Sequence, residues 1–309
     1  MRANKRQKDI LNYIDDDNGL ITLIAHKRRE NKKSKTIIGV PHPFLKWAGG
    51  KRQLLGQIEE YLPKKFNKYI EPFVGGGALF FYLLPEEAVL IDTNEELVNT
   101  YLIIKNRVKE LIKSLKKHKN EKEYFYKVRN IDRNYKEYQK LSNVEKASRT
   151  IFLNRCCYNG LYRVNSKGQF NVPFGKYKNP KFCDEENLLA VNRVLQQAEI
   201  IAGDFEKCLE FSTPNDFVYF DPPYQPISET ANFTSYTKEN FSKEDQLRLF
   251  KTYQKLDERG CKVMLSNSYN DFIMNLYQKY KINYVSAKRA INSDANGRGE
   301  IRELLIINY

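Results

Sequence analysis

From Phe44 onward, short apolar runs alternate with longer amphipathic stretches. Each short run ends in Gly, Pro or an acidic residue, and bounded apolar runs of this kind predict buried strands. The predicted strands are residues 69–73, 89–92, 199–202, 217–220, 263–266, 282–287 and 304–308. Strands that alternate with helical stretches are typical of a mostly parallel sheet covered by helices, so we expect an α/β fold of the Rossmann-like type.

The spacing of these strands also predicts a second domain. About a hundred residues separate the second and third predicted strands, far more than one crossover helix needs. We therefore expect an inserted domain at 105–190, with charged helices over 105–145 and loops rich in Asn, Gly, Tyr and Phe over 150–183. The main domain is then 43–104 and 191–309, and residues 1–42 form a charged N-terminal arm to which the sequence assigns no role.

Composition narrows the class of protein. The 309 residues contain 52 Lys and Arg against 38 Asp and Glu, a net charge of +14, which favours a polyanionic partner such as nucleic acid without naming it. No apolar stretch approaches the 18 to 20 residues of a membrane span and no signal peptide is evident, so we expect a soluble, cytoplasmic protein without a membrane partner. Five cysteines without a CxxC pair predict neither a disulfide framework nor a zinc site, and no metal is expected.

The first candidate site is a glycine-rich turn. The strand at 69–73 ends at Phe73 and runs into Gly75, Gly76 and Gly77, after which an apolar helix begins. Glycines let the backbone approach a ligand closely, and a helix N-terminus favours a carboxylate or phosphate. Asp92 ends the next strand about seventeen residues later, where an acid can accept hydrogen bonds from ribose hydroxyls. Three glycines alone are equally typical of a plain turn; with Asp92 they indicate a nucleoside cofactor.

The second candidate site is Asp221-Pro222-Pro223-Tyr224, directly after the strand at 217–220. Two prolines cannot continue a strand ladder, so Asp221 and the Pro222 carbonyl are expected as paired acceptors at the carboxyl edge of the sheet. Two acceptors can hold both N–H groups of an exocyclic amine, while Tyr224 stacks on its base. The alternative is a Pro-Pro turn with an incidental aspartate.

A third cluster runs from Phe44 through Trp47 to Gly49-Gly50-Lys51. A phosphate loop is excluded, because the upstream Gly is missing and Arg52 stands where Ser or Thr would follow the lysine. Trp47 and Lys51 suit a zwitterionic sulfonium cofactor, with Lys51 meeting its carboxylate, although a sole tryptophan is more often a core residue.

The segment 150–183 combines basic and aromatic side chains and has no acid before Asp184. Such a mixture supplies phosphate contacts, base-edge donors and stacking groups for nucleic acid, whereas the bland alternative is a solvated loop. The residues on which this interpretation rests are Asn154, Arg155, Tyr158, Asn159, Tyr162, Arg163, Lys167, Phe170, Phe174, Lys176, Tyr177, Lys178 and Lys181.

From Pro43 to the C-terminus the chain resembles the Dam-type, D12-class adenine-specific DNA methyltransferases, and among them the DpnM-like methylases. The motifs that carry the resemblance are Trp47-Ala-Gly-Gly-Lys51, Glu71-Pro-Phe-Val-Gly-Gly-Gly77, Asn159-Gly-Leu-Tyr-Arg163, Phe170-Asn-Val-Pro-Phe-Gly175, Gly203-Asp204-Phe205, Asp221-Pro-Pro-Tyr224 and Met264-Leu-Ser-Asn-Ser268. Asp-Pro-Pro-Tyr alone also occurs in RNA methylases, but the ordered set is more specific.

The resemblance implies a seven-stranded S-adenosylmethionine-dependent methyltransferase sheet with a mostly helical target-recognition domain. It implies transfer of a methyl group to N6 of an adenine flipped out of duplex GATC, either beside a restriction endonuclease or as a solitary methylase. The implied cofactor contacts are Trp47, Lys51, Phe73, Gly75, Asp92, Asp204 and Asp221; the catalytic set is Asp221, Pro222 and Tyr224. The implied DNA contacts are Tyr158, Asn159, Leu161, Arg163, Pro173 and Lys176, with Arg163 as a bidentate guanine reader.

Two departures from the family pattern stand out. Lys176 occupies a position where relatives often carry Arg, which keeps a phosphate contact but not a planar bidentate one. The arm before Pro43 is longer than the family needs. Two rival functions remain at this level: an RNA methyltransferase with the same pocket, and a catalytically silent DNA-binding module.

Overall fold

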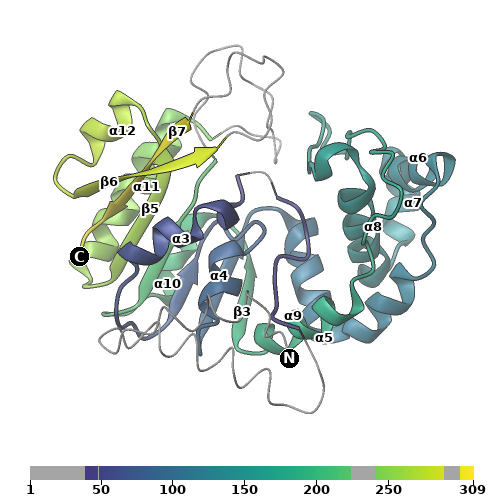
Figure 1. The fold of residues 1–309 in the computed structure, drawn as a ribbon, viewed down its shortest axis with the longest axis horizontal. Coiled ribbons are helices and arrows are strands. Elements are labelled where there is room, and N and C mark those ends of the chain that lie inside the picture. The colour runs from purple at the N-terminus through teal and green to yellow at the C-terminus, as the bar shows by residue number, and fades with distance from the viewer. Residues whose placement is uncertain (1–38, 48, 224–240, 289–299) are drawn as a thin grey trace, which may run out of the picture.

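The computed structural model describes residues 39–47, 49–223, 241–288 and 300–309. Its centre is a seven-stranded sheet in the order β3-β2-β1-β4-β5-β7-β6 (Figure 1). The strands are β1 (Tyr69–Glu71), β2 (Ala88–Asp92), β3 (Ala198–Ala202), β4 (Phe217–Phe220), β5 (Lys262–Ser268), β6 (Lys281–Lys288) and β7 (Glu300–Ile307). Each predicted strand is confirmed. β1 to β5 pair in parallel, while β7 lies antiparallel between β5 and β6.

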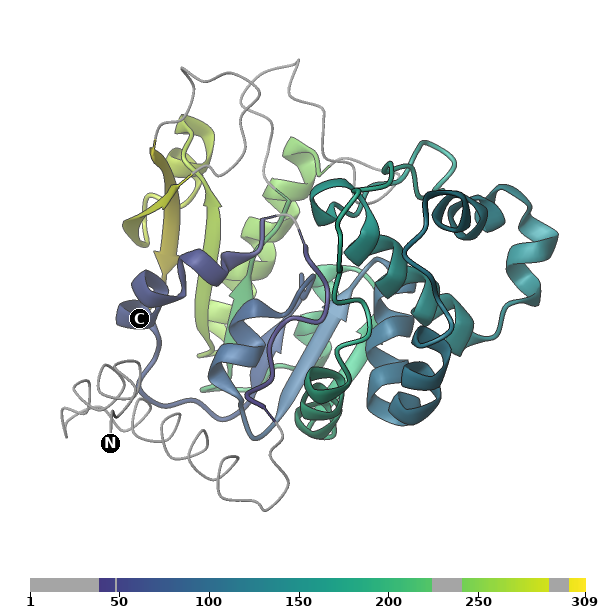
Figure 2. The same ribbon diagram turned by 45° about the vertical axis from the view of Figure 1, so that its right-hand side comes forward.

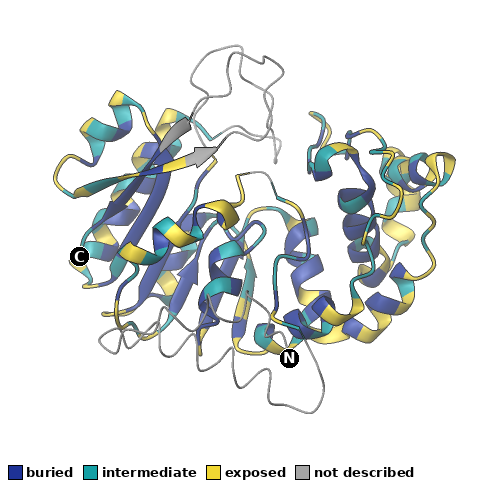
Figure 3. Cartoon of the chain, viewed as in Figure 1, coloured by how far each residue is buried: buried dark blue, intermediate teal, exposed yellow. Residues whose placement is uncertain are grey.

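Helices cover both faces of the sheet, because successive strand residues point to opposite sides. Within β1, Tyr69 packs into one apolar cluster and Ile70 into the other. The first face carries α3 (Leu55–Ile58), α4 (Ala78–Leu83), α5 (Glu95–Leu115) and α9 (Glu185–Leu195). The second carries α10 (Cys208–Phe211), α11 (Lys243–Glu258) and α12 (Asp271–Leu276). Figure 3 shows the buried strands between these layers.

A helical lobe stands beside the sheet in both ribbon views (Figures 1 and 2). It contains α6 (Lys122–Asn130), α7 (Tyr135–Lys140), α8 (Asn143–Cys156) and the loops that follow, around a core of its own that includes Phe125, Phe152 and Phe170. The expected boundaries at 105 and 190 fall inside α5 and α9, and α5 packs along both α8 and α9. The division into a main and an inserted domain stays a prediction.

The strand order creates a switch point between β1 and β4. These neighbours are parallel, but the chain leaves β1 toward β2 on one side and leaves β4 toward β5 on the other. Crossover connections therefore diverge at this point, and in open α/β sheets such a point is where a ligand-binding crevice forms, outside the carboxyl ends of the strands. Glu71 ends β1 and Asp221 follows β4, so the two acidic motifs of the sequence meet at this edge.

None of the described helices has the length and apolar character needed to cross a membrane.

Candidate active site

The glycine-rich turn after β1 has a backbone conformation that favours glycine. Gly75 has a φ of +45° and Gly77 a φ of +65°, conformations that other residues rarely adopt. A Cβ on Gly75 would lie 2.8 Å from Cδ1 of Trp47, so a larger residue is excluded by contact as well as by conformation. The turn leads into the N-terminus of α4, which begins at Ala78.

Asp92 ties this turn to the end of β2. Its Oδ2 accepts a hydrogen bond from the Gly75 N–H at 3.0 Å, and its Oδ1 accepts one from the Asn94 N–H at 2.9 Å. Burial raises the pKa of Asp92, and the backbone donors oppose that rise. Each oxygen retains a lone pair for a further donor. Asp92 is thus placed where the sequence predicted it, beside the glycine turn.

Glu71 is a site residue whose role the sequence reasoning missed. Its side chain is buried, and Oε2 has no hydrogen-bond partner among the described residues. Burial, with Asp221 as a nearby negative charge, raises the pKa of Glu71 well above its usual range. An unpaired buried acceptor is costly and calls for a donor. A cationic amine in the crevice would meet that need.

The opposite wall of the crevice is aromatic and acidic. Phe73 stacks on Phe205 with ring centroids 5.4 Å apart. Asp204 begins the 3-10 turn η5 (Phe205–Lys207) and accepts a hydrogen bond from the Glu206 N–H on Oδ1. Arg248 of α11 donates to the same oxygen at 2.9 Å. Phe73 and Asp204 therefore lie on one side of the switch point, near the ends of β1 and β3.

Asp221 lies at the centre of the site in an ion-pair cluster. The Lys51 ammonium, on the 3-10 turn η1 (Lys51–Gln53), is 2.7 Å from Asp221 Oδ1 and 3.6 Å from Glu303 Oε2. Burial raises the pKa of Asp221 to about 6, while Lys51 opposes that rise and Glu303 adds to it. Pro222 is buried beside Asp221, and Tyr224 lies outside the described residues. Lys51 therefore meets the predicted catalytic carboxylate; its predicted contact with a cofactor carboxylate stays a prediction.

Trp47 joins the main sheet to the helical lobe. Its ring stacks on Tyr162 with centroids 4.9 Å apart and an interplanar angle of 23°. The same ring lies against the glycine turn, as the blocked Cβ position of Gly75 shows. Trp47 is thus beside the predicted cofactor turn and in contact with the lobe at once.

Three of the six predicted DNA contacts form hydrogen bonds within a hairpin-like loop after α8. Isolated bridges join Cys157 to Phe174 and Val164 to Phe170. The Tyr158 N–H donates to the Pro173 carbonyl at 2.8 Å, and both of these residues are exposed. The Arg163 Nε donates to Asn171 Oδ1 at 2.8 Å.

The remaining members of the set lie on the same loop. Asn159 and Lys176 both have left-handed backbones, with φ of +56° and +55°. Leu161 and Asn159 are partly buried, whereas Lys176 is exposed. The loop therefore presents polar and basic groups of the kind that contact DNA.

Two residues that the sequence reasoning placed at the DNA interface are internal instead. Asn154 is fully buried: its side chain accepts from the Lys46 N–H and donates to the Lys46 carbonyl, both at 2.8 Å. The Arg155 Nε donates to the Phe44 carbonyl at 2.9 Å. These side chains fasten the segment before η1 to α8, so their prediction as DNA contacts is wrong.

The buried guanidinium of Arg149 stabilises the hairpin-like loop that follows α8. Arg149 on α8 is 2% exposed and donates to the carbonyls of Val128 and Arg129. Its Nη2 also contacts Asp132 Oδ2 at 2.6 Å, and that oxygen accepts the Phe170 N–H at 2.9 Å. The position of the hairpin therefore depends on a charged network inside the lobe.

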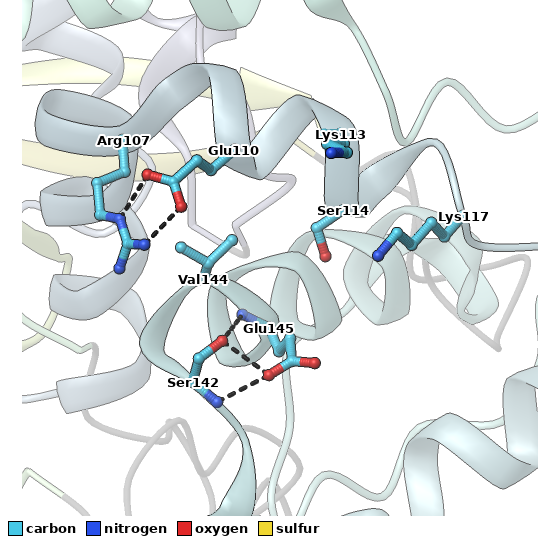
Figure 4. A pocket seen from close by; sticks show the side chains of 8 residues that line it. All are labelled: Arg107, Glu110, Lys113, Ser114, Lys117, Ser142, Val144 and Glu145. Atoms are coloured by element: carbon cyan, nitrogen blue, oxygen red, sulfur yellow. Dashed lines mark hydrogen bonds and ion pairs between the residues drawn. The ribbon is translucent and has the colours of Figure 1, made fainter.

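A hollow of about 360 Å³ lies elsewhere, between the second half of α5 and the start of α8 (Figure 4). Four of its polar residues are paired: Arg107 with Glu110, and Ser142 with Glu145 in a capping box. It lies away from the carboxyl edge of the sheet, and the pairing leaves it without an evident chemical role.

Comparison with known proteins agrees with this geometry. Residues 47–291 match the family model of the D12 class N6 adenine-specific DNA methyltransferase. The chain is 51% identical over 287 residues to the type II methyltransferase M.MjaIII of Methanocaldococcus jannaschii, covering 86% of this chain and 99% of the relative. It is 48% identical over 271 residues to the type II methyltransferase M1.LlaDCHI of Lactococcus lactis subsp. cremoris, covering 86% and 95% of the two chains. The DNA adenine methylase of Escherichia coli K12 is 36% identical over 269 residues, which cover 85% of this chain and 94% of that one. The chain therefore belongs to the D12 class and is a DNA adenine N6-methyltransferase.

Proposed function

We propose that this enzyme transfers a methyl group from S-adenosylmethionine to N6 of an adenine flipped out of duplex GATC. The observation that carries the proposal is the position of Asp221: it follows β4 at the switch point, 2.7 Å from the Lys51 ammonium and near enough to Glu71 at the end of β1 to raise the pKa of that residue. Ligands of open α/β sheets bind at this point.

The crevice fits the chemistry of the cofactor. An unpaired Oε2 on Glu71 suits an ammonium group, and Asp92 retains acceptor capacity for ribose hydroxyls. Gly75 and Phe73 line the same turn, Asp204 offers an acceptor to an adenine amino group, and Trp47 closes the turn from the lobe side. When bound, S-adenosylmethionine supplies an electrophilic methyl group.

Asp221 acts mainly by position and charge. Its carboxylate and the Pro222 carbonyl hold the two N–H groups of the target amine, which orients the nitrogen lone pair toward the electrophile. N6 becomes acidic only as it acquires positive charge, so Asp221 need not be a strong base beforehand. Tyr224 is proposed to stack on the base. The Lys51 ammonium lies 2.7 Å from Oδ1 of this carboxylate.

On the DNA side, we assign Tyr158, Asn159, Leu161, Arg163, Pro173 and Lys176 to the interface. The net charge of +14 supports binding to a polyanion, and extruding a base costs a few kcal/mol that protein contacts offset. A restriction partner is supported by the two relatives named type II methyltransferases. The reaction is proposed to take place in the cytoplasm.

The test is methyl transfer from labelled S-adenosylmethionine to two duplexes that differ only in GATC versus GTTC, followed by identification of the modified nucleoside. N6-methyladenine only with GATC is expected. Label in both duplexes would keep the chemistry and overturn the target sequence, whereas label in structured RNA alone would favour an RNA methyltransferase.

Two variants separate chemistry from recognition. Asp221→Ala is expected to abolish transfer while duplex affinity survives, and comparable activity would refute the assignment. Arg163→Ala is expected to lose about 1–3 kcal/mol of discrimination between GATC and single-base variants. An unchanged preference would remove Arg163 from this role.

A further inference from the structure

Glu303 joins the active site from a distant part of the chain. It lies on β7, where it pairs with Ser268 at the end of β5. Because β7 runs antiparallel to β5, its early residues reach the edge at which β4 and β5 end. Glu303 is buried, and its Oε2 is 3.6 Å from the ammonium of Lys51.

The Lys51 ammonium lies near two carboxylates that have different roles. Asp221 Oδ1 lies at 2.7 Å and is the carboxylate that the proposed reaction needs for the target amine. Glu303 Oε2 lies 3.6 Å from the same ammonium, which also donates to the Gly49 carbonyl at 3.0 Å, and Glu303 has no assigned role in base or cofactor binding. Lys51 itself is 4% exposed, so its charge cannot be left to solvent when the contact with Asp221 is broken.

We propose that Glu303 is a positioning residue for methyl transfer: it holds Lys51 when the target adenine takes over Asp221. This inference rests on the proposed function of Asp221. In the free enzyme Lys51 pairs with Oδ1 of Asp221 and so competes with an N6–H for this carboxylate. Glu303 lowers the free-energy cost of replacing Lys51 by the adenine amine at Asp221. The buried ammonium moves from one carboxylate toward another and therefore keeps a negative neighbour.

The electrostatic surroundings of Asp221 allow a specific test. The titratable and charged groups that face it are Lys51 from η1, Tyr69 and Glu71 from β1, Tyr219 from β4 and Glu303 from β7. Of these, Lys51 lowers the pKa of Asp221 and Glu303 raises it. Removing the charge of Glu303 therefore moves the pKa of Asp221 down and leaves Lys51 paired more firmly with it.

The experiment compares the full-length parent with Glu303→Gln, Glu303→Asp and the surface control Glu210→Gln. Methyl transfer to a GATC duplex is measured as kcat/KM for the duplex at fixed salt and saturating cofactor across the acidic limb, because this constant reports the ionisations of the enzyme–cofactor complex before DNA binds. We expect Glu303→Gln to lower the plateau value of kcat/KM about tenfold, because the buried ammonium then has no second carboxylate when it leaves Asp221. The acidic limb of the kcat/KM profile of Glu303→Gln is also expected to move to lower pH. Glu303→Asp should recover part of the plateau kcat/KM, and Glu210→Gln should match the parent.

A second readout does not depend on catalysis. The ¹³C carboxyl resonance of Asp221, assigned by its absence in Asp221→Asn, is titrated without cofactor or DNA. Its midpoint is expected to fall in Glu303→Gln. A lower plateau kcat/KM with an unchanged titration midpoint of Asp221 would mean that Glu303 has a merely structural role. A shifted midpoint with an unchanged plateau kcat/KM would mean that Glu303 only repels Asp221. Either result overturns the proposal. If Asp221→Asn transfers methyl groups normally, the proposed function fails; if it is inactive while Glu303→Gln behaves like the parent, only the role of Glu303 fails.

Discussion

Ionisation of Asp221 is expected to cost the free enzyme stability, and Asp221→Asn tests this. The carboxyl has an ordinary pKa of 3.8, which burial raises to about 6 in the folded protein. The folded state therefore holds this proton more tightly than the unfolded chain, and ionisation disfavours folding. The cost is absent below about pH 4, grows as pH rises through the interval, and is complete above about pH 6.

The magnitude follows from the difference between the two pKa values. At 1.36 kcal/mol per pH unit, a pKa raised from 3.8 to about 6 corresponds to about 3 kcal/mol. Asparagine keeps the shape of the protonated acid and never ionises. At pH 8, Asp221→Asn should therefore raise the free energy of unfolding by about 3 kcal/mol, and near pH 4 the two proteins should be equally stable.

Urea unfolding of the parent and of Asp221→Asn at several pH values measures this difference directly. Other ionisations are common to both proteins and largely cancel in the comparison. A difference that does not change with pH, or a parent that is the more stable protein at pH 8, would refute the electrostatic reasoning. The expected gain in stability accompanies loss of methyl transfer, since the buried charge that weakens the fold is the one the reaction uses.

Three further substitutions test other parts of the structure. Gly75→Ala places a Cβ 2.8 Å from Trp47 Cδ1 at a positive φ and should weaken cofactor affinity at least about tenfold, which calorimetric titration measures; unchanged affinity would contradict the proposed turn. Arg149→Lys keeps the charge but loses the fork that spans two carbonyls and Asp132, and should lower the free energy of unfolding by about 3 kcal/mol in urea with cofactor affinity retained. Lys176→Ala should weaken binding to all duplexes alike and reduce the slope of the logarithm of the binding constant against the logarithm of salt concentration by about 1. A loss of affinity confined to GATC duplexes would instead mean that Lys176 contacts a base.

The sequence predicted the main sheet well because its strands are short, apolar and bounded by turn residues. It also placed Asp92 and Asp221 correctly, since the acid that ends a parallel strand must lie at the carboxyl edge. Glu303 escaped prediction because it lies on an antiparallel strand, and the spacing of strands along the chain gives neither their order in the sheet nor their direction. Glu71 was passed over as part of a glycine motif, although an acidic residue at the end of an apolar strand was the signal in the sequence.

The errors in the lobe have a different cause. Asn154 and Arg155 have the composition of a DNA-contacting segment, yet they lie on α8 and face the chain before η1. A helix turns its neighbours toward different surfaces, and which surface meets Phe44 depends on packing between segments more than a hundred residues apart. Composition alone could not separate these side chains from Tyr158 and Lys176 on the exposed loop.

Trp47 gives the protein a built-in optical reporter. It is the sole tryptophan of the chain, so its emission is not mixed with that of a second indole. Its ring touches the lobe through Tyr162 and the glycine turn through Gly75. A change at either contact alters the surroundings of the same fluorophore, so stopped-flow emission from the unlabelled enzyme can time the arrival of each ligand in turn.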